Sequence, residues 1–204
     1  MHEATWGRAE AIAMLDARER YATQDPGHLW DLVGLHEGDV VVDVGAGTGF
    51  FAFPASSRVG EQGSVYAVDV SEDLLDLIGE RAEAGHFRNL HTVLSTPTRI
   101  PLEDGTADVV LLANVLHGVP PSTVAEAVRV LRPGGRLVNV DWKKRETPQG
   151  PPVRHRLSPA EASAALRACG VKRQSSFDLG PYHYVLVFLR PAPGRRPGHL
   201  VSAE

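Results

Sequence analysis

Three glycines at alternate positions follow an apolar run that ends in an acid, in the segment VVVDVGAGTGF from Val40 to Phe50. The valines predict a buried strand. The glycines permit a tight turn that a Cβ atom would forbid, and they let a ligand approach the main chain. We therefore predict a strand, a turn and a helix start that hold a nucleotide-like cofactor. The expected binding residues here are Asp43, Gly45, Ala46, Gly47, Thr48, Gly49 and Phe50.

A second acid, Asp69, ends the next predicted strand. At that position it can accept hydrogen bonds from ribose hydroxyls, and the neighbouring Val70 is assigned to the same site. Asp43 indicates which ligand group lies beside the glycine turn. A carboxylate there repels a pyrophosphate but attracts a cationic amino-acid group. This argument favours S-adenosylmethionine over NAD, and leaves an NAD-dependent oxidoreductase as the less favoured alternative.

These segments resemble the class I S-adenosylmethionine-dependent methyltransferases. VVDVGAGTGF is similar to their first motif, and VYAVDVS to the acidic loop after their second strand. Further along, IPLEDGTADVV is similar to their LPFxDxxFDVV segment and LRPGGRL to their LKPGGxL turn. The later DWKK…GPP…RLSP text looks like a type 11-like subgroup of small bacterial and archaeal members. The resemblance implies S-adenosylmethionine as cofactor and S-adenosylhomocysteine as its product.

The expected fold is α/β, a doubly wound, Rossmann-like sheet of seven mostly parallel strands with an antiparallel hairpin at its C-terminal end. The alternation of strand-like and helix-like patterns supports parallel strands joined by crossover helices. We predict strands at 40–44, 64–69, 90–94, 107–113, 136–140, 171–177 and 184–189. We predict helices at 9–21, 28–35, from about 49, and at 71–84, 122–131 and 158–168.

Thr96 and Pro97 depart from the family's pattern. In many members an acid at the position of Thr96 bonds the adenine amino group, and the next backbone N–H meets a ring nitrogen. Pro97 has no N–H to donate. We expect either that adenine is recognised differently, with the Thr96 hydroxyl, Thr98 or Glu103 as substitutes, or that the affinity for the cofactor is reduced.

Asn114 and His117 follow the fourth predicted strand, where the sulfonium methyl group should lie, and we assign both to the reaction. Asn114 is assigned to the cofactor as well. Histidine can accept a proton from an O–H or N–H nucleophile near neutral pH. Family members of differing chemistry carry similar text here, so the sequence leaves His117 equally open to a base and to a packing residue.

The expected activity is methyl transfer to a small-molecule acceptor, with an O, N, C or S nucleophile unresolved. A non-catalytic S-adenosylmethionine-binding protein is the alternative, motivated by Thr96 and Pro97 and by the lack of a certain base. The loop from Asp141 to Arg156 is open to two interpretations, an acceptor-binding lid or a rigid connection with a basic surface.

Composition supports one globular domain, with 204 residues, 43% of them hydrophobic, and a net charge of −4. That charge disfavours nucleic-acid substrates. A single cysteine, Cys169, and the lack of a signal peptide or a membrane-length apolar run predict a cytoplasmic protein that does not enter the membrane, as a monomer or homodimer. The scattered histidines predict no metal site. We divide the chain into an N-terminal helical segment (1–37), the methyltransferase domain (38–190) and a disordered tail (191–204).

Overall fold

A seven-stranded sheet with the strand order β3-β2-β1-β4-β5-β7-β6 organises the computed structural model, which describes residues 8–192. The strands are β1 (Val40–Val44), β2 (Ser64–Asp69), β3 (Leu90–Leu94), β4 (Ala107–Ala113), β5 (Leu131–Trp142), β6 (Lys172–Leu179) and β7 (His183–Leu189). Strands β1 to β5 pair in parallel, whereas β7 pairs antiparallel with both β5 and β6. The predicted fold class is confirmed.

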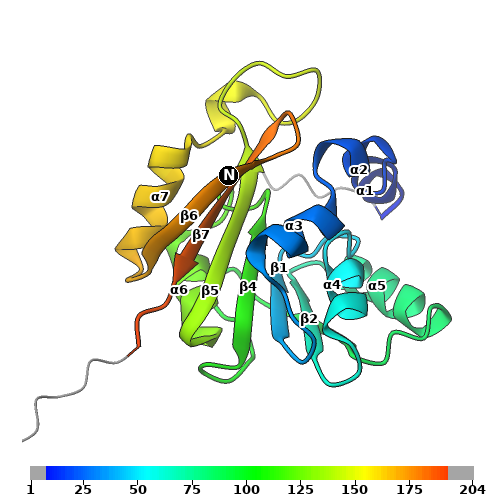
Figure 1. The fold of residues 1–204 in the computed structure, drawn as a ribbon. Coiled ribbons are helices and arrows are strands. Elements are labelled where there is room, and N and C mark those ends of the chain that lie inside the picture. The colour runs from blue at the N-terminus through cyan, green and yellow to red at the C-terminus, as the bar shows by residue number, and fades with distance from the viewer. Residues whose placement is uncertain (1–7, 193–204) are drawn as a thin grey trace, which may run out of the picture.

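Helices cover both faces of the sheet (Figure 1). They are α1 (Arg8–Leu15), α2 (Glu19–Thr23), α3 (Pro26–Val33), α4 (Ala52–Val59), α5 (Glu72–Ala84), α6 (Pro121–Val130) and α7 (Pro159–Ala168), with a short 3-10 helix at Val153–His155. One core joins α3, α4 and α5 to the sheet, and a second core joins α6 and α7 to the opposite face. Central strands are therefore buried on both sides, as the valine-rich sequence of β1 predicts.

The N-terminal region differs from the single helix predicted over 9–21. The structure has α1 and α2 there, with a turn between Asp16 and Arg18. The next helix, α3, begins at Pro26, two residues earlier than predicted, because the Asp25 side chain accepts the backbone N–H groups of Gly27 and His28.

Strand β5 starts at Leu131 rather than at 136 as predicted. The glycine turn after Leu131 is pinned to the end of β7 by two backbone hydrogen bonds, Gly134 N to Arg190 O at 2.8 Å and Arg190 N to Gly135 O at 3.0 Å. A turn motif read from sequence carries no information about this long-range pairing.

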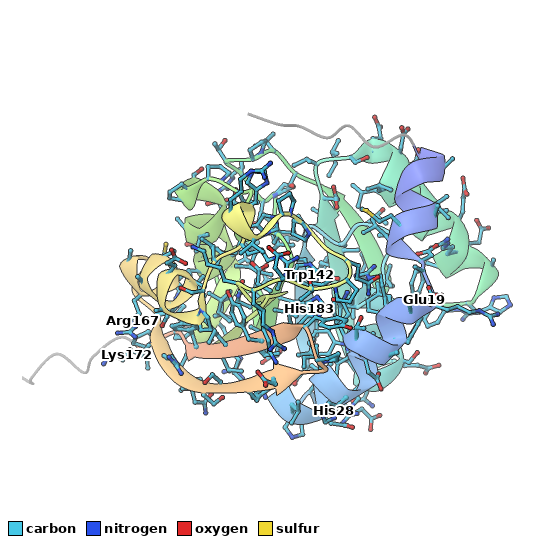
Figure 2. All side chains as sticks on the ribbon, turned by 90° about the horizontal axis from the view of Figure 1, so that it is seen from above. Glu19, His28, Trp142, Arg167, Lys172 and His183 are labelled. Atoms are coloured by element: carbon cyan, nitrogen blue, oxygen red, sulfur yellow. The ribbon has the colours of Figure 1, made fainter. Side chains whose placement is uncertain are left out.

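The C-terminal end of α2 packs directly on the β6–β7 turn. His183 Nδ1 lies 3.2 Å from the Thr23 carbonyl oxygen, and a Cβ atom at Gly180 would lie 2.3 Å from the same oxygen. Seen from above, His183 and Trp142 lie together near the middle of the molecule, with their ring centroids 4.1 Å apart (Figure 2). The hairpin thus supports α2 from one side.

Within residues 8–192, no helix combines the length and apolar character needed to cross a bilayer. Trp30 is 1% exposed and donates its indole N–H to the Phe51 carbonyl, so it packs α3 on α4. Of the predicted tail, residues 193–204 lie outside the described residues.

Candidate active site

A cavity of about 510 Å³ opens at the carboxyl ends of β1, β2 and β4. This is the edge where parallel sheets bind ligands. Eleven of the residues assigned to the cofactor from sequence line it: Asp43, Gly45, Ala46, Gly47, Thr48, Phe50, Asp69, Val70, Thr96, Pro97 and Asn114. Gly49 and His117 do not line this cavity.

The glycine turn after β1 exposes its main chain to the cavity. Gly45 has φ +75°, and a Cβ atom there would lie 2.6 Å from Val115 Cγ1 across the cavity wall. The backbone N–H groups of Gly45 and Ala46 donate to the Val68 carbonyl at 2.8 and 3.1 Å, which ties the turn to the end of β2. Glycine is required here both for the backbone angle and for the close approach.

Asp69 holds the turn as well as facing the cavity. Its Oδ2 accepts the Gly47 N–H at 2.9 Å and its Oδ1 accepts the Ser71 N–H at 3.0 Å. Each carboxylate oxygen has a second lone pair, so the group can accept ribose hydroxyls while keeping both backbone bonds. The sequence indicated the ligand role but not the structural one.

Asp43 is a buried carboxyl with an unused oxygen. It is 1% exposed, and no polar group of the described residues lies within hydrogen-bond distance of its Oδ2. Burial, and next the charge of Asp69, raise the pKa of Asp43 to about 7, although Arg20 acts in the opposite direction. A cationic ligand group beside Asp43 would favour its ionised form.

Arg20, from α2, also lines the cavity and was missed by the sequence analysis. Its guanidinium carbon lies 3.9 Å from the centre of the Phe50 ring, and the group donates to the Leu15 carbonyl. Burial lowers the pKa of Arg20 to about 10, so it stays cationic at neutral pH. No sequence signal marks it, because an arginine on a short polar helix normally faces solvent.

Asn114 sits at the end of β4 in a left-handed conformation, with φ 59°. Its backbone N–H donates to the Val140 carbonyl at 2.8 Å, and its Nδ2 donates to Gln24 Oε1 at 2.9 Å. Among the described residues, the buried Oδ1 of Asn114 has no hydrogen-bond partner. The amide is thus held by the C-cap residue of α2, and its oxygen, without a partner among the described residues, belongs to a residue that lines the cavity.

His117 does not line the cavity, although its neighbours Val115 and Gly118 do. Its Nδ1 lies 3.5 Å from Asp141 Oδ1, and Asp141 is fully buried. The same Oδ1 accepts the Trp142 N–H at 2.8 Å, which fixes the carboxylate at the end of β5. His117 and Asp141 form a pair beside the cofactor cavity rather than within it.

The loop around Thr96, where adenine was expected, differs in its hydrogen bonds from the family's pattern. The Thr96 N–H is already bonded to the Arg99 carbonyl at 3.0 Å, so it is not free for a purine. Ser95 lines the cavity, and its hydroxyl donates to the Asp69 carbonyl at 3.2 Å. Of the substitutes expected from sequence, Thr96 lines the cavity, whereas Thr98 and Glu103 do not.

The loop after β5 is held by a buried arginine. Arg156 is 3% exposed and donates to the carbonyls of Pro151 at 2.7 Å, Arg145 at 2.9 Å and Lys143 at 3.1 Å. None of the loop residues lines the cavity. These contacts favour the rigid connection over the acceptor-binding lid.

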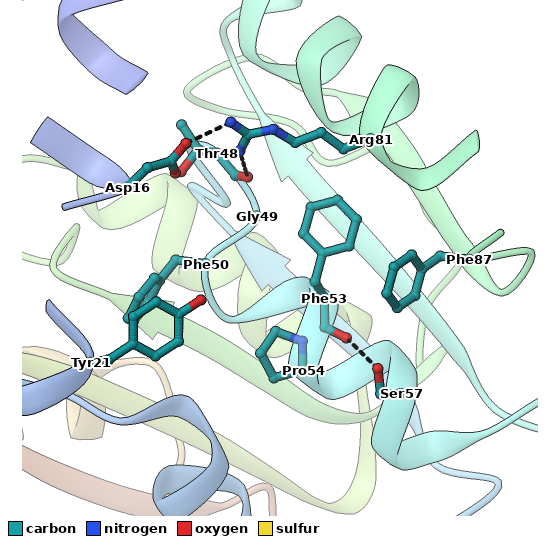
Figure 3. Close-up of a pocket in the computed structure, with 10 residues that line it drawn as sticks. All are labelled: Asp16, Tyr21, Thr48, Gly49, Phe50, Phe53, Pro54, Ser57, Arg81 and Phe87. Carbon is teal, nitrogen blue, oxygen red and sulfur yellow. Dashed lines mark hydrogen bonds and ion pairs between the residues drawn. The ribbon is translucent and has the colours of Figure 1, made fainter. Parts of the chain in front are cut away.

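A second hollow of about 340 Å³ lies on the outer side of the glycine turn (Figure 3). Gly49 lines it, and a Cβ atom at Gly49 would lie 2.6 Å from the Phe53 ring. At its rim Arg81 donates to the Thr48 carbonyl at 3.2 Å and pairs with Asp16 at 2.6 Å. The arginine therefore joins α5 and the segment after α1 to the turn that carries the cofactor site.

Known proteins are similar to this chain over the segments that form the sheet and the glycine turn. A family model described as a methyltransferase domain matches residues 42–139. The crystal structure of an S-adenosylmethionine-dependent methyltransferase from Aquifex aeolicus is 31% identical, covers 91% of this chain and 100% of its own, and superposes with a TM-score of 0.86. A putative type 11 methyltransferase from Sulfolobus solfataricus is 26% identical over 87% of this chain and 99% of its own, with a TM-score of 0.69.

Curated relatives match over a shorter part of their length. A demethylmenaquinone methyltransferase from Symbiobacterium thermophilum is 34% identical over 52% of this chain and 44% of its own. Another from Lactococcus lactis is 28% identical over 67% of this chain and 53% of its own. The chain spans about half the length of these relatives.

Proposed function

Because this chain belongs to the S-adenosylmethionine-dependent methyltransferases, with S-adenosylmethionine as cofactor, we propose that it moves the sulfonium methyl group to a small-molecule nucleophile. The observation that carries this proposal is the cavity that combines the bare glycine turn, Asp69 and the buried, unpaired Asp43. The cofactor supplies an activated methyl group and its leaving group. The protein then has to position the two reactants and assist the movement of one proton.

The residues present fit the cofactor group by group. The free lone pairs of Asp69 suit ribose hydroxyls, and the unpaired Asp43 Oδ2 suits an ammonium. At Gly45 a Cβ atom would lie 2.6 Å from Val115 Cγ1, so glycine lets this residue of the cavity wall pack against the turn. An NAD pyrophosphate would instead bring negative charge close to Asp43, which disfavours the oxidoreductase alternative.

For the acceptor we propose a small quinol-type ring. Several relatives are named demethylmenaquinone methyltransferases, and others ubiquinone/menaquinone biosynthesis C-methyltransferases. Apolar side chains of Leu15, Val115 and Val119 in the cavity wall suit a ring of this kind.

For the proton transfer we propose His117 as the base and Asp141 as the residue that orients it. With Nδ1 directed at the Asp141 carboxylate, the other ring nitrogen is left to accept a proton. Replacing His117 with Gln should lower kcat on a quinol on the order of 10²-fold while the affinity for S-adenosylhomocysteine stays constant. If the affinity falls and turnover per bound enzyme does not, His117 is a packing residue.

We also propose that the protein works in the cytoplasm on free small molecules, as a monomer or homodimer. The net charge of −4 and the single cysteine support this setting. Sedimentation of the purified chain measures the oligomeric state.

Two assays test the proposal in sequence. Isothermal titration with S-adenosylmethionine, S-adenosylhomocysteine and NAD should show binding of the first two only. Methyl-labelled cofactor should then transfer label to a reduced demethylated naphthoquinone. Binding without transfer to this acceptor or to any component of a metabolite extract would instead support a non-catalytic binding protein.

A further inference from the structure

We infer that Arg20 binds the carboxylate of the cofactor's amino-acid group and makes the cavity select ligands that carry both an amino and a carboxylate charge. This inference rests on the proposed function. It adds a residue from outside the sheet, on a helix that precedes β1, to the set that recognises the cofactor.

The position of the guanidinium supports this assignment. Arg20 lines the same cavity as Asp43 and the glycine turn, and the Phe50 ring lies under its guanidinium at 3.9 Å. A planar cation stacked on an aromatic face directs its N–H groups outward in the guanidinium plane, and those of Arg20 that do not bond the Leu15 carbonyl remain for a ligand. Guanidinium edges match carboxylates in bidentate geometry.

The charges around the cavity also require a cation for the carboxylate. Among the described residues that line it, Asp43 and Asp69 are the acids and Arg20 is the only cation. A ligand carboxylate placed here without Arg20 would lie among two other carboxylates in a sheltered site, which is strongly unfavourable. Asp43 and Arg20 together present one charge of each sign, the complement of an amino acid.

The helix that carries Arg20 is held in place before any ligand arrives. The next turn of α2 contributes Thr23, whose carbonyl meets His183 Nδ1 at 3.2 Å, and the following residue, Gln24, bonds Asn114 at 2.9 Å. A preorganised cation contributes more to affinity than one that must be ordered on binding.

The test compares three ligands that share the nucleoside. S-adenosylhomocysteine carries both charges, decarboxylated S-adenosylhomocysteine keeps only the ammonium, and 5′-methylthioadenosine has neither. In isothermal titration the wild-type protein should bind S-adenosylhomocysteine about 10- to 100-fold more tightly than the decarboxylated ligand, as expected for a charge-assisted hydrogen bond. Equal affinities in the wild-type protein overturn the inference without any variant.

Replacing Arg20 with Met should remove that preference, while the affinity for 5′-methylthioadenosine stays within about twofold. The decarboxylated ligand should bind the variant equally or more tightly, because its ammonium no longer faces a guanidinium. Arg20→Lys should keep part of the preference. Arg173→Met, which removes an exposed arginine on β6, is the matched control and should change nothing.

If Arg20→Met lowers the affinity for all three ligands by the same factor, Arg20 only packs in the cavity wall and the inference is wrong. Failure of the proposed function has a different signature, because then none of the three ligands binds the wild-type protein.

Discussion

Replacing Asp43 with Asn should make the ligand-free protein more stable above neutral pH and at the same time weaken cofactor binding. Both effects have one cause. A carboxylate that is 1% exposed and has an unpaired oxygen is costly to ionise in the empty cavity, yet it is the group that an ammonium needs. Asn keeps the shape and removes the charge.

The magnitude follows from the pKa of Asp43, which rises from 3.8 in the unfolded chain to about 7 in the folded one. A folded pKa above the unfolded value means that the folded state binds the extra proton between these limits. Its contribution to stability is fully present below 3.8 and is lost as the pH rises through about 7. This rise in pKa corresponds to an upper limit of roughly 4 kcal/mol. Because Arg20 loses a neighbouring negative charge in the variant, we expect a net gain of roughly 1 to 3 kcal/mol at about pH 8.

Chemical denaturation at about pH 5 and pH 8, with and without S-adenosylhomocysteine, measures both effects. The free energy of unfolding of the ligand-free wild type should fall between these pH values, and that of Asp43→Asn should fall less. Titration should show the ligand binding the variant on the order of 10- to 100-fold more weakly. Asp76→Asn, an exposed acid on α5, is the control for loss of one negative charge.

The reasoning is refuted if Asp43→Asn lowers the stability of the ligand-free protein at about pH 8. Asp43 would then be an ionised partner of Arg20 that stabilises the fold, rather than a strained group held for the ligand.

Three other substitutions test the remaining parts of the cavity. Asp69→Ala should weaken S-adenosylhomocysteine binding by roughly 2 kcal/mol, and denaturation should also show a loss of roughly 1 to 3 kcal/mol, because the Gly47 N–H and a second backbone N–H lose their acceptor. Gly45→Ala should destabilise the protein by about 1 to 3 kcal/mol and impair binding, because its φ is +75° and its Cβ would meet Val115 at 2.6 Å; full stability in a melt would contradict this. Pro97→Ala should raise S-adenosylhomocysteine affinity about two- to tenfold in titration if the restored N–H reaches adenine, and unchanged or weaker binding would place the purine away from this loop.

The sheet was predictable because its strands carry strong local signals. In β1 both faces are buried, so the strand is valine-rich on both of them and ends where the glycines begin. For α7, Ser158 and Glu161 form a capping box around Pro159, the first residue of the helix. Each of these signals lies within a few residues of the feature that it predicts.

The contributions of α2 were not predictable in this way. Arg20 and Gln24 become site residues only because the chain brings them against Phe50 and Asn114, which are 30 and 90 residues further along. The same limit applies to His117, whose position after β4 was predictable but whose orientation toward Asp141 depends on the end of β5. Polar residues on a short helix carry no pattern that separates a ligand contact from a solvated surface.

Helix α2 and its C-cap residue contact both the cofactor cavity and Asn114. Arg20, Thr23 and Gln24 stand at i, i+3 and i+4, so they share one helix face, and that face meets the cofactor cavity, the β6–β7 turn and Asn114. A movement of α2 that withdraws Arg20 from the cavity therefore also breaks the bond from Asn114 Nδ2 to Gln24. Since Asn114 follows β4 where the methyl group is expected, α2 and its C-cap residue Gln24 contact both the proposed amino-acid end and the proposed reacting end of the site. Occupation of the Arg20 position by a carboxylate would therefore stabilise the placement of α2 in which Gln24 bonds Asn114.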